Sequence, residues 1–570
     1  MIRHWLFFVL LLVVLGGGST AVFLPTSLSP HHTTLAQTAP TLFVALDGSD
    51  DSGDGSAERP FRTLTHAAPL APPGSTIYLR GGVYHEQTVF SAVGTAVNPI
   101  TIQPAPGETV IFDGTGLPIP DDQHLVLISE STHVLFTGFE MTNSSGRGLG
   151  VFESEAITLR DNRVHEIRGR GIGGGGNLIT IEDNEVWRTS LENENEAFNA
   201  TGGWKAGIST YRRFDGSPST NFVIRHNQIH DIWGEGIIAI FADGVQIDGN
   251  EIHDTYSVNI YIDNARNVTI NGNYLYATTT RYNRSDRFVP ANAIHLANES
   301  YDNAPATQLD NIIIANNLML GTGRGVSYWH DQSNLDPSNS YRNVSIVYNV
   351  IADTHEDAIR FDGVGLFSQP PQNVLVQNNI IFAGGNGEVL NIGNSEGWTF
   401  SHNNWPDGVP ELAEEPDSFA ANPLFANPGL AGRPEDFMLQ PHSSSIGAGQ
   451  PFAPLPVDYL GRLRDPQRPS LGIFEMADVA AVDEEAAPGD ELDDGGETAV
   501  SAPEPTPLPS DTSPQTIGQE PTQPTPTPPP AAPANNTPAN DNLPLIGGIV
   551  FISIVLLFIL LRFMRIAANR

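Results

Sequence analysis

The stretches FVIRHNQI (222–229), VQIDGNEI (245–252) and VTINGNYL (268–275) decide the fold, because they repeat one pattern at a fixed spacing. Each stretch alternates apolar side chains with others, has an asparagine at its sixth position and ends on an apolar residue. The three asparagines, of which Asn227 is the first, lie 23 residues apart. Alternation with a period of two is typical of strands, and a repeat in the low twenties predicts a solenoid.

The same element recurs on both sides of these stretches. It is found as ITLRDNRV, ITIEDNEV, IIIANNLM, VSIVYNVI, VLVQNNII and, more weakly, TFSHNNW, with asparagines at Asn162, Asn184, Asn317, Asn349, Asn379 and Asn403; VLFTGFEM has Phe139 in this position. Steps of 22 to 24 residues predict one turn each, and steps of 32 and 30 predict one turn with a longer loop. The steps of 43 (Asn184 to Asn227) and 44 (Asn273 to Asn317) are interpreted as about two turns.

A second short strand accompanies this element. Its inward residues are expected at Ile208, Ile237, Ile260, Ile294, Val326, Ile359 and Leu390. Two or three short strands per turn predict a parallel β-helix, in which the recurrent asparagine is an inward amide bonded to backbone groups and to its neighbours. An asparagine-lined binding surface is the less favoured interpretation. A leucine-rich-repeat solenoid would need a regular leucine frame and helical segments, and neither is visible.

The composition limits the class of protein. Of the 570 residues, 55 are Gly and 45 are Pro and only 16% are charged, which favours a turn-rich β-architecture over helical bundles. The chain has no cysteine, which excludes disulfides and thiolate metal sites. The formal net charge of −37 argues against nucleic acid as a partner, because phosphate binding needs a basic face.

The two ends of the chain predict secretion and membrane attachment. Residues 1–36 are expected to hold a signal peptide and leader; cleavage near Ala21 and near Ala36 both stay open, and an uncleaved anchor is the weaker alternative. Residues 543–561 carry no charge and are long enough to cross a bilayer. Arginines in the tail, residues 562–570, place the tail in the cytoplasm and the remainder outside the cell.

Residues 477–541 are expected to form a disordered stalk, because they are acidic at first and then rich in Pro, Thr, Ser, Gln and Ala. The predicted organisation is therefore a leader, a β-helix over residues 41–475, the stalk, one transmembrane helix and a short tail. Such a protein is a single-pass protein of the cell membrane with its β-helix outside.

The body of the chain resembles bacterial extracellular right-handed β-helix proteins of the pectate-lyase-like superfamily. The stretches FVALDGSDDSGDG and RPFRTLTHAAPLAPPGSTIYLRGGVYHE are similar to the N-terminal capping module of this group. The resemblance implies an early strand at Leu42–Ala45, an amphipathic capping helix around Phe61–Ala68 and a first coil at Thr76–Leu79. Capping matters because an open solenoid edge invites edge-to-edge pairing.

The stretch from NPLFANPG to LGIFE is similar to a closing segment found near surface anchors in such proteins. Together these resemblances imply a right-handed single-stranded parallel β-helix. They identify the reaction poorly, because many chemistries and some non-enzymes share this scaffold.

In this superfamily the substrate lies along the outer face of one parallel sheet. The outward residues beside the second strand are Ser209, Ile238, Tyr261, His295, Ser327, Arg360 and Asn391, which are expected to stack in that order. Consecutive coils lie about 4.8 Å apart. We therefore expect one patch that contains Tyr261, Asp263, His295, His330, Arg360 and Asp362. A polar outer face with isolated charges is the competing interpretation.

These residue types suit a sugar chain, which needs aromatic faces, an Arg for uronate carboxylates and Asp for acid–base work or Ca²⁺. The candidate catalytic residues are Lys205, Asp263, His295, Arg360 and Asp362. The candidate substrate-binding residues are Trp204, Tyr211, Tyr261, Trp329 and His330. Asp263 and Asp362 are the candidate ligands of a Ca²⁺ cofactor. The long loops at 185–204 and 277–290 are placed to wall a groove.

Lys205 is the only lysine of the chain. Related polysaccharide lyases use a Lys or Arg to abstract the proton α to a uronate carboxylate, often with Ca²⁺, and the resemblance implies this role for Lys205 beside Trp204. A lysine acts as a base only where neighbours or desolvation lower its pKa. No compact Asp cluster of the calcium-lyase type surrounds it in sequence, and a solvated surface lysine is the alternative.

These features favour a surface-anchored protein that binds and cleaves extracellular polysaccharide, as a lyase or a glycoside hydrolase. The alternative is a non-catalytic surface solenoid with a binding, adhesive or structural role, for which the stalk and anchor would suffice.

Overall fold

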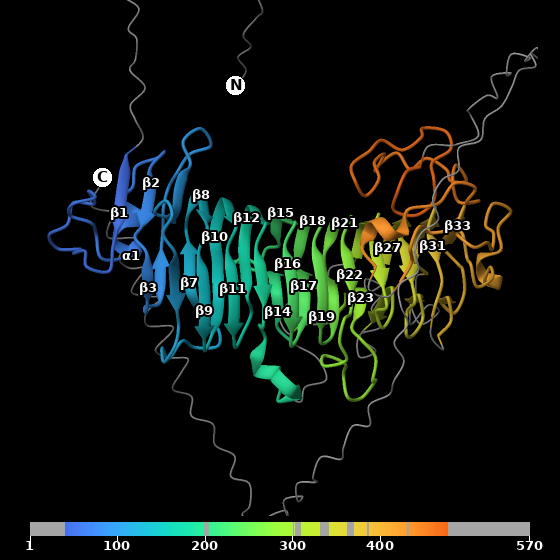
Figure 1. Cartoon of the computed structure of the whole chain (residues 1–570), viewed down its shortest axis with the longest axis horizontal. Helices are drawn as coiled ribbons and strands as arrows, with labels where there is room; N and C mark the ends of the chain where they lie inside the picture. Colours follow the sequence, from blue (N-terminus) through green and yellow to red (C-terminus); the bar gives the residue numbers. More distant parts are fainter. Residues whose placement is uncertain are drawn as a thin grey trace, which may run out of the picture. The chain divides into compact units, whose positions relative to one another are not determined.

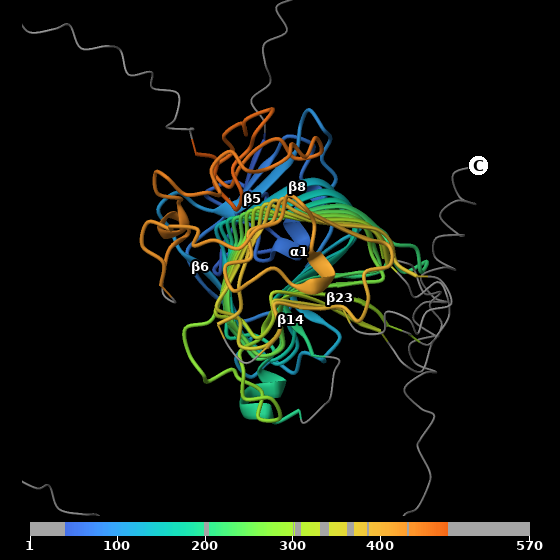
Figure 2. The same cartoon turned by 90° about the vertical axis from the view of Figure 1, so that its right-hand side faces the viewer.

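The computed structural model describes residues 40–198, 204–299, 301, 309–330, 341–361, 370–384, 387–429 and 432–476. Every strand pairing between named strands in this part of the chain is parallel, and the strands form three rows that run along one axis (Figure 1). Seen along that axis, successive coils superimpose closely (Figure 2). The predicted parallel β-helix is therefore confirmed, with three strands in most coils.

The first row consists of β1 (Thr41–Val44), β2 (Thr76–Leu79), β5 (Ile100–Pro104), β8 (Thr132–Thr137), β15 (Ser219–Arg225), β18 (Ala242–Asp248), β21 (Arg266–Asn271), β24 (Leu309–Ala315), β27 (Tyr341–Val347), β30 (Gln372–Gln377) and β33 (Trp398–Ser401). The second row consists of β3 (Gly82–Tyr84), β6 (Val110–Asp113), β9 (Glu140–Ser144), β11 (Arg163–Ile167), β13 (Glu185–Trp187), β16 (Gln228–Ile232), β19 (Glu251–Thr255), β22 (Tyr274–Tyr276), β25 (Leu318–Leu320), β28 (Val350–Ala352) and β31 (Ile380–Ile381).

The third row consists of β4 (Thr88–Phe90), β7 (His124–Ser129), β14 (Ala206–Thr210), β17 (Glu235–Ile240), β20 (Val258–Asp263), β23 (Asn292–Asn298), β26 (Val326–His330), β29 (Ile359–Phe361) and β32 (Leu390–Asn391). Two long strands, β10 (Arg147–Arg160) and β12 (Ile172–Glu182), pair in both the third and the first row. Three rows of parallel strands enclose the core.

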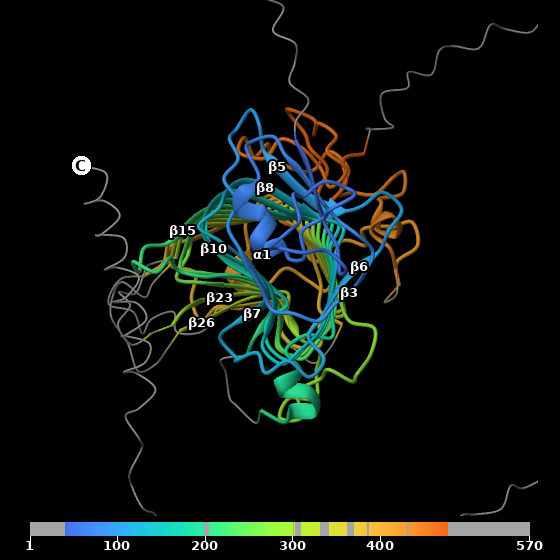
Figure 3. The same cartoon turned by 90° about the vertical axis from the view of Figure 1, so that its left-hand side faces the viewer.

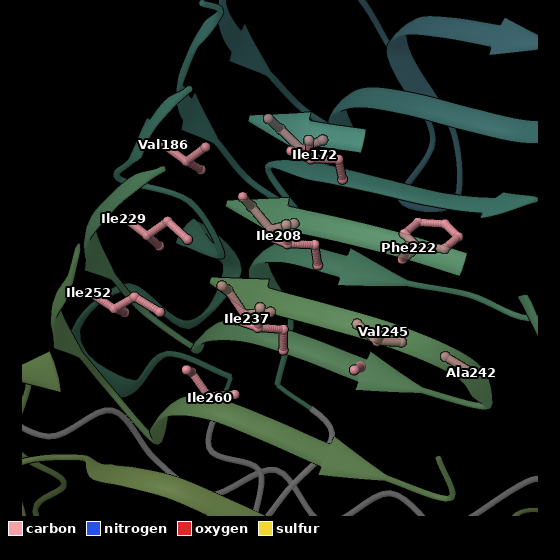
Figure 4. Packing of buried hydrophobic residues seen from close by; sticks show 14 of the residues in the cluster. Ile172, Val186, Ile208, Phe222, Ile229, Ile237, Ala242, Val245, Ile252 and Ile260 are labelled. Atoms are coloured by element: carbon pink, nitrogen blue, oxygen red, sulfur yellow. The ribbon is translucent and has the colours of Figure 1, made fainter. Parts of the chain in front are cut away.

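The core is built from like residues stacked between coils. Ile172, Ile208, Ile237 and Ile260 are in register from strand to strand and are fully buried (Figure 4). Full burial of such a side chain contributes roughly 1.5–3 kcal/mol of transfer free energy. Repetition of this contribution in each coil explains how a chain without cysteine holds an elongated fold.

The recurrent asparagines form the predicted ladder. From Asn162 to Asn403, each side-chain amide donates to the side-chain oxygen of the next asparagine at 2.9–3.1 Å. The same oxygens accept the backbone N–H of the preceding asparagine, and all of the side chains are buried. The residue before each asparagine has positive φ, as at Asp161 and Gly249, which turns the chain inward at the bend.

The interpretation of the two longest steps was wrong. The amide of Asn184 donates directly to Asn227 at 3.0 Å, and that of Asn273 donates to Asn317 at 2.9 Å. Each step is therefore a single coil, since ladder bonds join only adjacent coils. The additional residues lie in loops, chiefly between β13 and β14 and between β22 and β23.

The first described residues include a short helix that packs on the core. A short helix, α1 (Leu64–Ala67), continues into a 3₁₀ turn at Ala68–Leu70, and Leu64 and Ala67 are buried in the main core cluster. Thr63 accepts a hydrogen bond from the backbone of His66 and so caps α1 at its N-terminus. In the end view, α1 lies over the interior of the coils (Figure 3). The helix is shorter than the span expected from Phe61 to Ala68.

The segment after β33 folds back along the second row. Phe425, Phe437 and Ile473 pack on buried residues of β22, β25, β28 and β31. Short 3₁₀ helices at Glu411–Ala413 and Pro434–Phe437 are its only helices among the described residues. The buried guanidinium of Arg464 fastens the segment, because it donates to Asn316 at 2.7 Å and lies 3.8 Å above the ring of Tyr348.

The predicted leader, stalk, transmembrane helix and tail lie outside the described residues. Among the residues that the structure describes, none belongs to a helix long and apolar enough to span a membrane.

Candidate functional site

The predicted outward column is present on the third row. Ser209, Ile238, Tyr261, His295, Ser327, Arg360 and Asn391 are consecutive partners from β14 to β32. The inward isoleucines fix this register, because the next residue of a strand points to the opposite face. The periodicity of the sequence thus identified both the face and the order of the stack.

A cavity of about 330 Å³ opens on this face. Strands β17, β20, β23 and β26 contribute Glu235, Tyr261, His295 and Trp329 to it. The loops that account for the long spacings provide its walls with Trp204, Arg284 and Arg287. The expectation that these loops wall a groove is confirmed for these three residues.

Four arginines line the cavity: Arg170, Arg284, Arg287 and Arg324. Arg287 and Arg324 both pair with the carboxylate of Glu356. Among the described residues Arg170 forms no ion pair; its guanidinium lies 5.1 Å from the ring of Tyr211. Arg284 pairs with Asp286 at 2.7 Å. Four guanidinium groups therefore gather in one cavity of a chain whose net charge is −37, and three of them are paired with carboxylates.

Glu235 is the least solvated acid of the cavity. Its side chain is buried, and no described side chain donates a hydrogen bond to it. Burial raises the pKa of Glu235 well above its ordinary value, and the nearby charges of Glu299 and Asp263 add to this effect while Arg170 opposes it. The raised pKa favours the protonated form of Glu235, which is able to donate its proton.

A hydrogen-bonded group of acids and phenols lies beside Glu235. The hydroxyl of Tyr261 is 2.6 Å from Glu299, and that of Tyr301 is 2.9 Å from Glu299 and 2.6 Å from Asp263. Asp263 has no solvent exposure and also accepts hydrogen bonds from the backbone of Glu299 and the amide of Asn264. Burial, with the charge of Glu299, raises the pKa of Asp263 to about 8.

Tyr261 and His295 form the floor of the cavity. Their rings stack with centroids 5.6 Å apart, and Nδ1 of His295 is 2.7 Å from the hydroxyl of Ser327. Burial lowers the pKa of His295 to about 3, and the charges of Arg324 and Arg287 contribute. His295 is therefore neutral at physiological pH.

The structure separates the other predicted residues from this cavity. Lys205 places its amine 2.5 Å from Glu192, in the wall loop, and does not line the cavity. Arg360 lies two coils beyond His295 and pairs with Asp357 at 3.1 Å. The ring of Tyr211 stacks on Phe152 instead. These placements divide the single patch that the sequence predicted.

Two predicted residues cannot be placed. Asp362 and the side chain of His330 lie outside the described residues. Trp329 lines the cavity at 39% exposure, and Trp204 lines it from the loop side.

The residues of the cavity do not fit a calcium ion. Among the described residues, no three acidic or histidine side chains converge as a metal site would require. One oxygen of Asp263 accepts hydrogen bonds from Asn264 and Glu299, and the other is bonded to the hydroxyl of Tyr301. Its raised pKa keeps it protonated, whereas calcium prefers ionised carboxylates. The predicted calcium role of Asp263 is therefore not supported by this geometry.

The sequence reasoning missed Arg170, Glu235, Asn292 and Arg324 as cavity residues. Each stands two positions before an inward residue of its coil (Ile172, Ile237, Ile294 and Val326). The signal that could have identified them is the run of charged and amide side chains two positions before the inward residues of successive coils.

Two family models match the chain. One, described as a Pel9A-like right-handed β-helix region, matches residues 42–220, and one described as a right-handed β-helix region matches residues 190–341. Both descriptions indicate that the coil of this chain is right-handed. They cover the segment that contains α1 and every cavity strand up to β26.

Curated relatives align with parts of the chain. The protein YwoF of Bacillus subtilis, which is uncharacterized, is 26% identical over 209 residues, or 33% of this chain and 43% of that protein. Pectate lyase PEL9 of Emericella nidulans is 40% identical over 82 residues, or 14% and 20%. The chain thus spans less than half the length of these two relatives.

Solved structures resemble parts of the chain at low identity. XylC in complex with xylose is 13% identical with a TM-score of 0.48, over 76% of this chain and 98% of that chain. Pectate lyase Pel9A is 17% identical with a TM-score of 0.39, over 77% and 97%. The Streptococcus pneumoniae adhesin PfbA is 12% identical with a TM-score of 0.43, over 58% and 80%. By the family matches that run from residue 42 to residue 341, the chain belongs to the right-handed β-helix proteins, and its N-terminal part is of the Pel9A-like type.

Proposed function

We propose that this protein binds an acidic polysaccharide along the third row and cleaves it in the cavity. The observation that carries the proposal is that four arginines, aromatic rings and a buried carboxyl group with a raised pKa meet in one hollow. Guanidinium groups bind carboxylates through paired hydrogen bonds, and an acidic protein needs cationic groups at its site to attract an anionic polymer. The relative that is a pectate lyase supports polysaccharide as the class of substrate.

The acids of the cavity support hydrolysis. In this mechanism Glu235 donates its proton to the glycosidic oxygen as the bond from that oxygen to the sugar carbon breaks. Glu299, which accepts two phenol hydrogen bonds, is placed to face the positive charge that develops on the sugar. Water then supplies a hydroxyl group to the sugar carbon and returns a proton to Glu235.

Elimination is a second candidate, favoured by the neutral imidazole of His295 in a cavity that Arg287 and Arg324 also line. Here a guanidinium neutralises the uronate carboxylate, and His295 takes the proton from the adjacent carbon. The electron pair forms a carbon–carbon double bond as the bond to the leaving oxygen breaks, and Glu235 protonates that oxygen.

The test is a panel of polygalacturonate, alginate and neutral xylan incubated with the purified full-length protein. New reducing ends without ultraviolet absorbance indicate hydrolysis, and absorbance from an unsaturated product indicates elimination. Binding of the acidic polymers without any product would support the non-catalytic surface solenoid. Neither binding nor cleavage of the acidic polymers would overturn the proposal.

We also propose, from the sequence alone, that the protein is secreted by its leader (1–36) and anchored by residues 543–561. Protease treatment of intact cells that express the protein should then remove the β-helix and leave a membrane-bound C-terminal fragment. Recovery of the whole chain in the soluble fraction would contradict this topology.

A further inference from the structure

The loop between β14 and β15 holds a phenylalanine in solvent. Phe214 is 78% exposed, although its backbone N–H donates to Glu153 at 2.7 Å and the neighbouring Arg213 pairs with the same carboxylate. The loop turns back at Gly216, which has positive φ and donates to Arg213 at 2.9 Å. Because these bonds fix the loop to β10, the exposed ring has a defined position.

Phe214 is the outer ring of an aromatic stack. It lies 5.4 Å from Phe152 with an interplanar angle of 16°, and Phe152 lies 5.5 Å from Tyr211 with an angle of 25°. Gly173 makes room for this stack, since a Cβ there would lie 2.6 Å from the ring of Tyr211. The stack therefore depends on the absence of a side chain at Gly173 of β12.

The stack adjoins the cavity through shared residues. Arg170, which lines the cavity, lies 5.1 Å from the ring of Tyr211, and Arg147 lies 5.3 Å from the same ring. At the other end of the cavity is Trp329, also exposed, on β26. Four coil steps separate β14 from β26, which corresponds to ~19 Å along the axis.

We propose that Phe214, supported by Phe152, forms a second sugar-binding subsite of this cleft. It would receive a uronate residue of the same acidic polymer whose cleaved bond lies in the cavity, with the sugar ring against Phe214 and its carboxylate toward Arg147. This inference rests on the proposed function. It predicts an enzyme that recognises long chains and cuts within them, because a short oligosaccharide cannot reach both Phe214 and the cavity.

The experiment measures affinity for polygalacturonate and for a trigalacturonide with wild type and Phe214→Ala. We expect the affinity for the polymer to fall about tenfold, with no change for the trisaccharide. Phe214→Trp should restore polymer binding, because it restores an aromatic face. Leu463→Ala is the matched control, since Leu463 is 77% exposed but belongs to the segment after β33.

Wild-type affinity for the polymer in Phe214→Ala would overturn the inference and leave the proposed function standing. An equal loss for polymer and trisaccharide would also overturn it, because Phe214 would then act on the cavity itself. Failure of the wild type to bind the polymer would overturn the proposed function and this inference together.

Discussion

The hydroxyl of Tyr301 lies 2.6 Å from a carboxyl oxygen of Asp263 that has no access to solvent. The hydroxyl group of Tyr301 has one hydrogen to donate, yet its oxygen also lies 2.9 Å from a carboxyl oxygen of Glu299. Both contacts are hydrogen bonds only if one of the two carboxyls carries a proton. The pKa of Asp263, raised to about 8, assigns the proton to Asp263, which then donates to Tyr301 while Tyr301 donates to Glu299.

This assignment predicts the effect of Asp263→Asn. An ordinary Asp has a pKa of 3.8, so between about pH 4 and pH 8 the folded protein holds one proton more than the unfolded chain. Its stability therefore falls as the pH rises through this window. The amide of Asn donates to Tyr301 without titrating, so the variant should lose this part of the pH dependence. Urea unfolding at several pH values measures the slope; an unchanged slope would contradict the assignment.

Glu235→Gln tests the proposed acid. The amide fills the same space but has no proton to donate, so cleavage of the acidic polymer should fall about 10²–10⁴-fold while binding is retained. In the wild type, activity should fall as the pH rises through the raised pKa of Glu235. Glu155→Gln, at an exposed position on β10, serves as the control and should be fully active. Full activity of Glu235→Gln would exclude the proposed role.

Replacement of Lys205 tests whether this lysine, and not His295, is the base of an elimination reaction. Its amine is only partly exposed and is paired with the buried carboxylate of Glu192, so Lys205→Met leaves that charge without its partner. We expect a loss of roughly 1–3 kcal/mol in the free energy of unfolding and only a small loss of activity. The double variant with Glu192→Gln should recover much of the stability. A loss of activity in Lys205→Met as large as in Glu235→Gln, with the fold intact, would instead identify Lys205 as the base.

Arg170 should determine the preference for acidic polymers. Since it forms no ion pair among the described residues, its charge is available to a ligand carboxylate. Arg170→Met should weaken binding of polygalacturonate about tenfold, or about 1.4 kcal/mol, without affecting a neutral glucan. Arg168→Met, which removes an exposed arginine of the same coil, should bind as the wild type does. Equal affinities of wild type and Arg170→Met for the acidic polymer would show that Arg170 does not bind the polymer.

The periodic part of the fold was predictable because it is encoded locally. Each inward isoleucine and each ladder asparagine marks its own coil, so strands, facing and register follow from the sequence, as the stack from Ser209 to Asn391 shows. The 43- and 44-residue steps were misinterpreted because a loop may leave a coil without breaking the ladder. A spacing alone does not distinguish a long loop from an additional coil.

The site was only partly predictable, because some of its residues belong to the repeat and others come from loops outside the repeat. Tyr261 and His295 follow their isoleucines and were found, whereas Arg284 and Tyr301 reach the cavity from loops that have no repeat. Lys205 stands beside Trp204 in sequence but turns to Glu192, because a buried carboxylate attracts the nearest cation. The positions of these side chains depend on contacts between coils and loops, which cannot be inferred from a single sequence.

The stability lost when a ladder asparagine is replaced should depend on the position of that asparagine in the ladder. Asn273 accepts from the backbone and amide of Asn250 at 2.9 and 3.0 Å and donates to Ile247 at 2.8 Å and to Asn317 at 2.9 Å. Asn273→Ala leaves several buried groups without partners, so we expect a loss of roughly 2–4 kcal/mol in the free energy of unfolding.

Asn403, the last ladder residue among those described, accepts from Asn379 in the same way but donates to the backbone of Val376 and to no further ladder oxygen. Asn403→Ala should therefore cost about 1 kcal/mol less than Asn273→Ala. Urea unfolding of both variants compares the two losses. Equal losses would mean that the side-chain bond between asparagines contributes little, and that the ladder acts mainly through the backbone groups it satisfies.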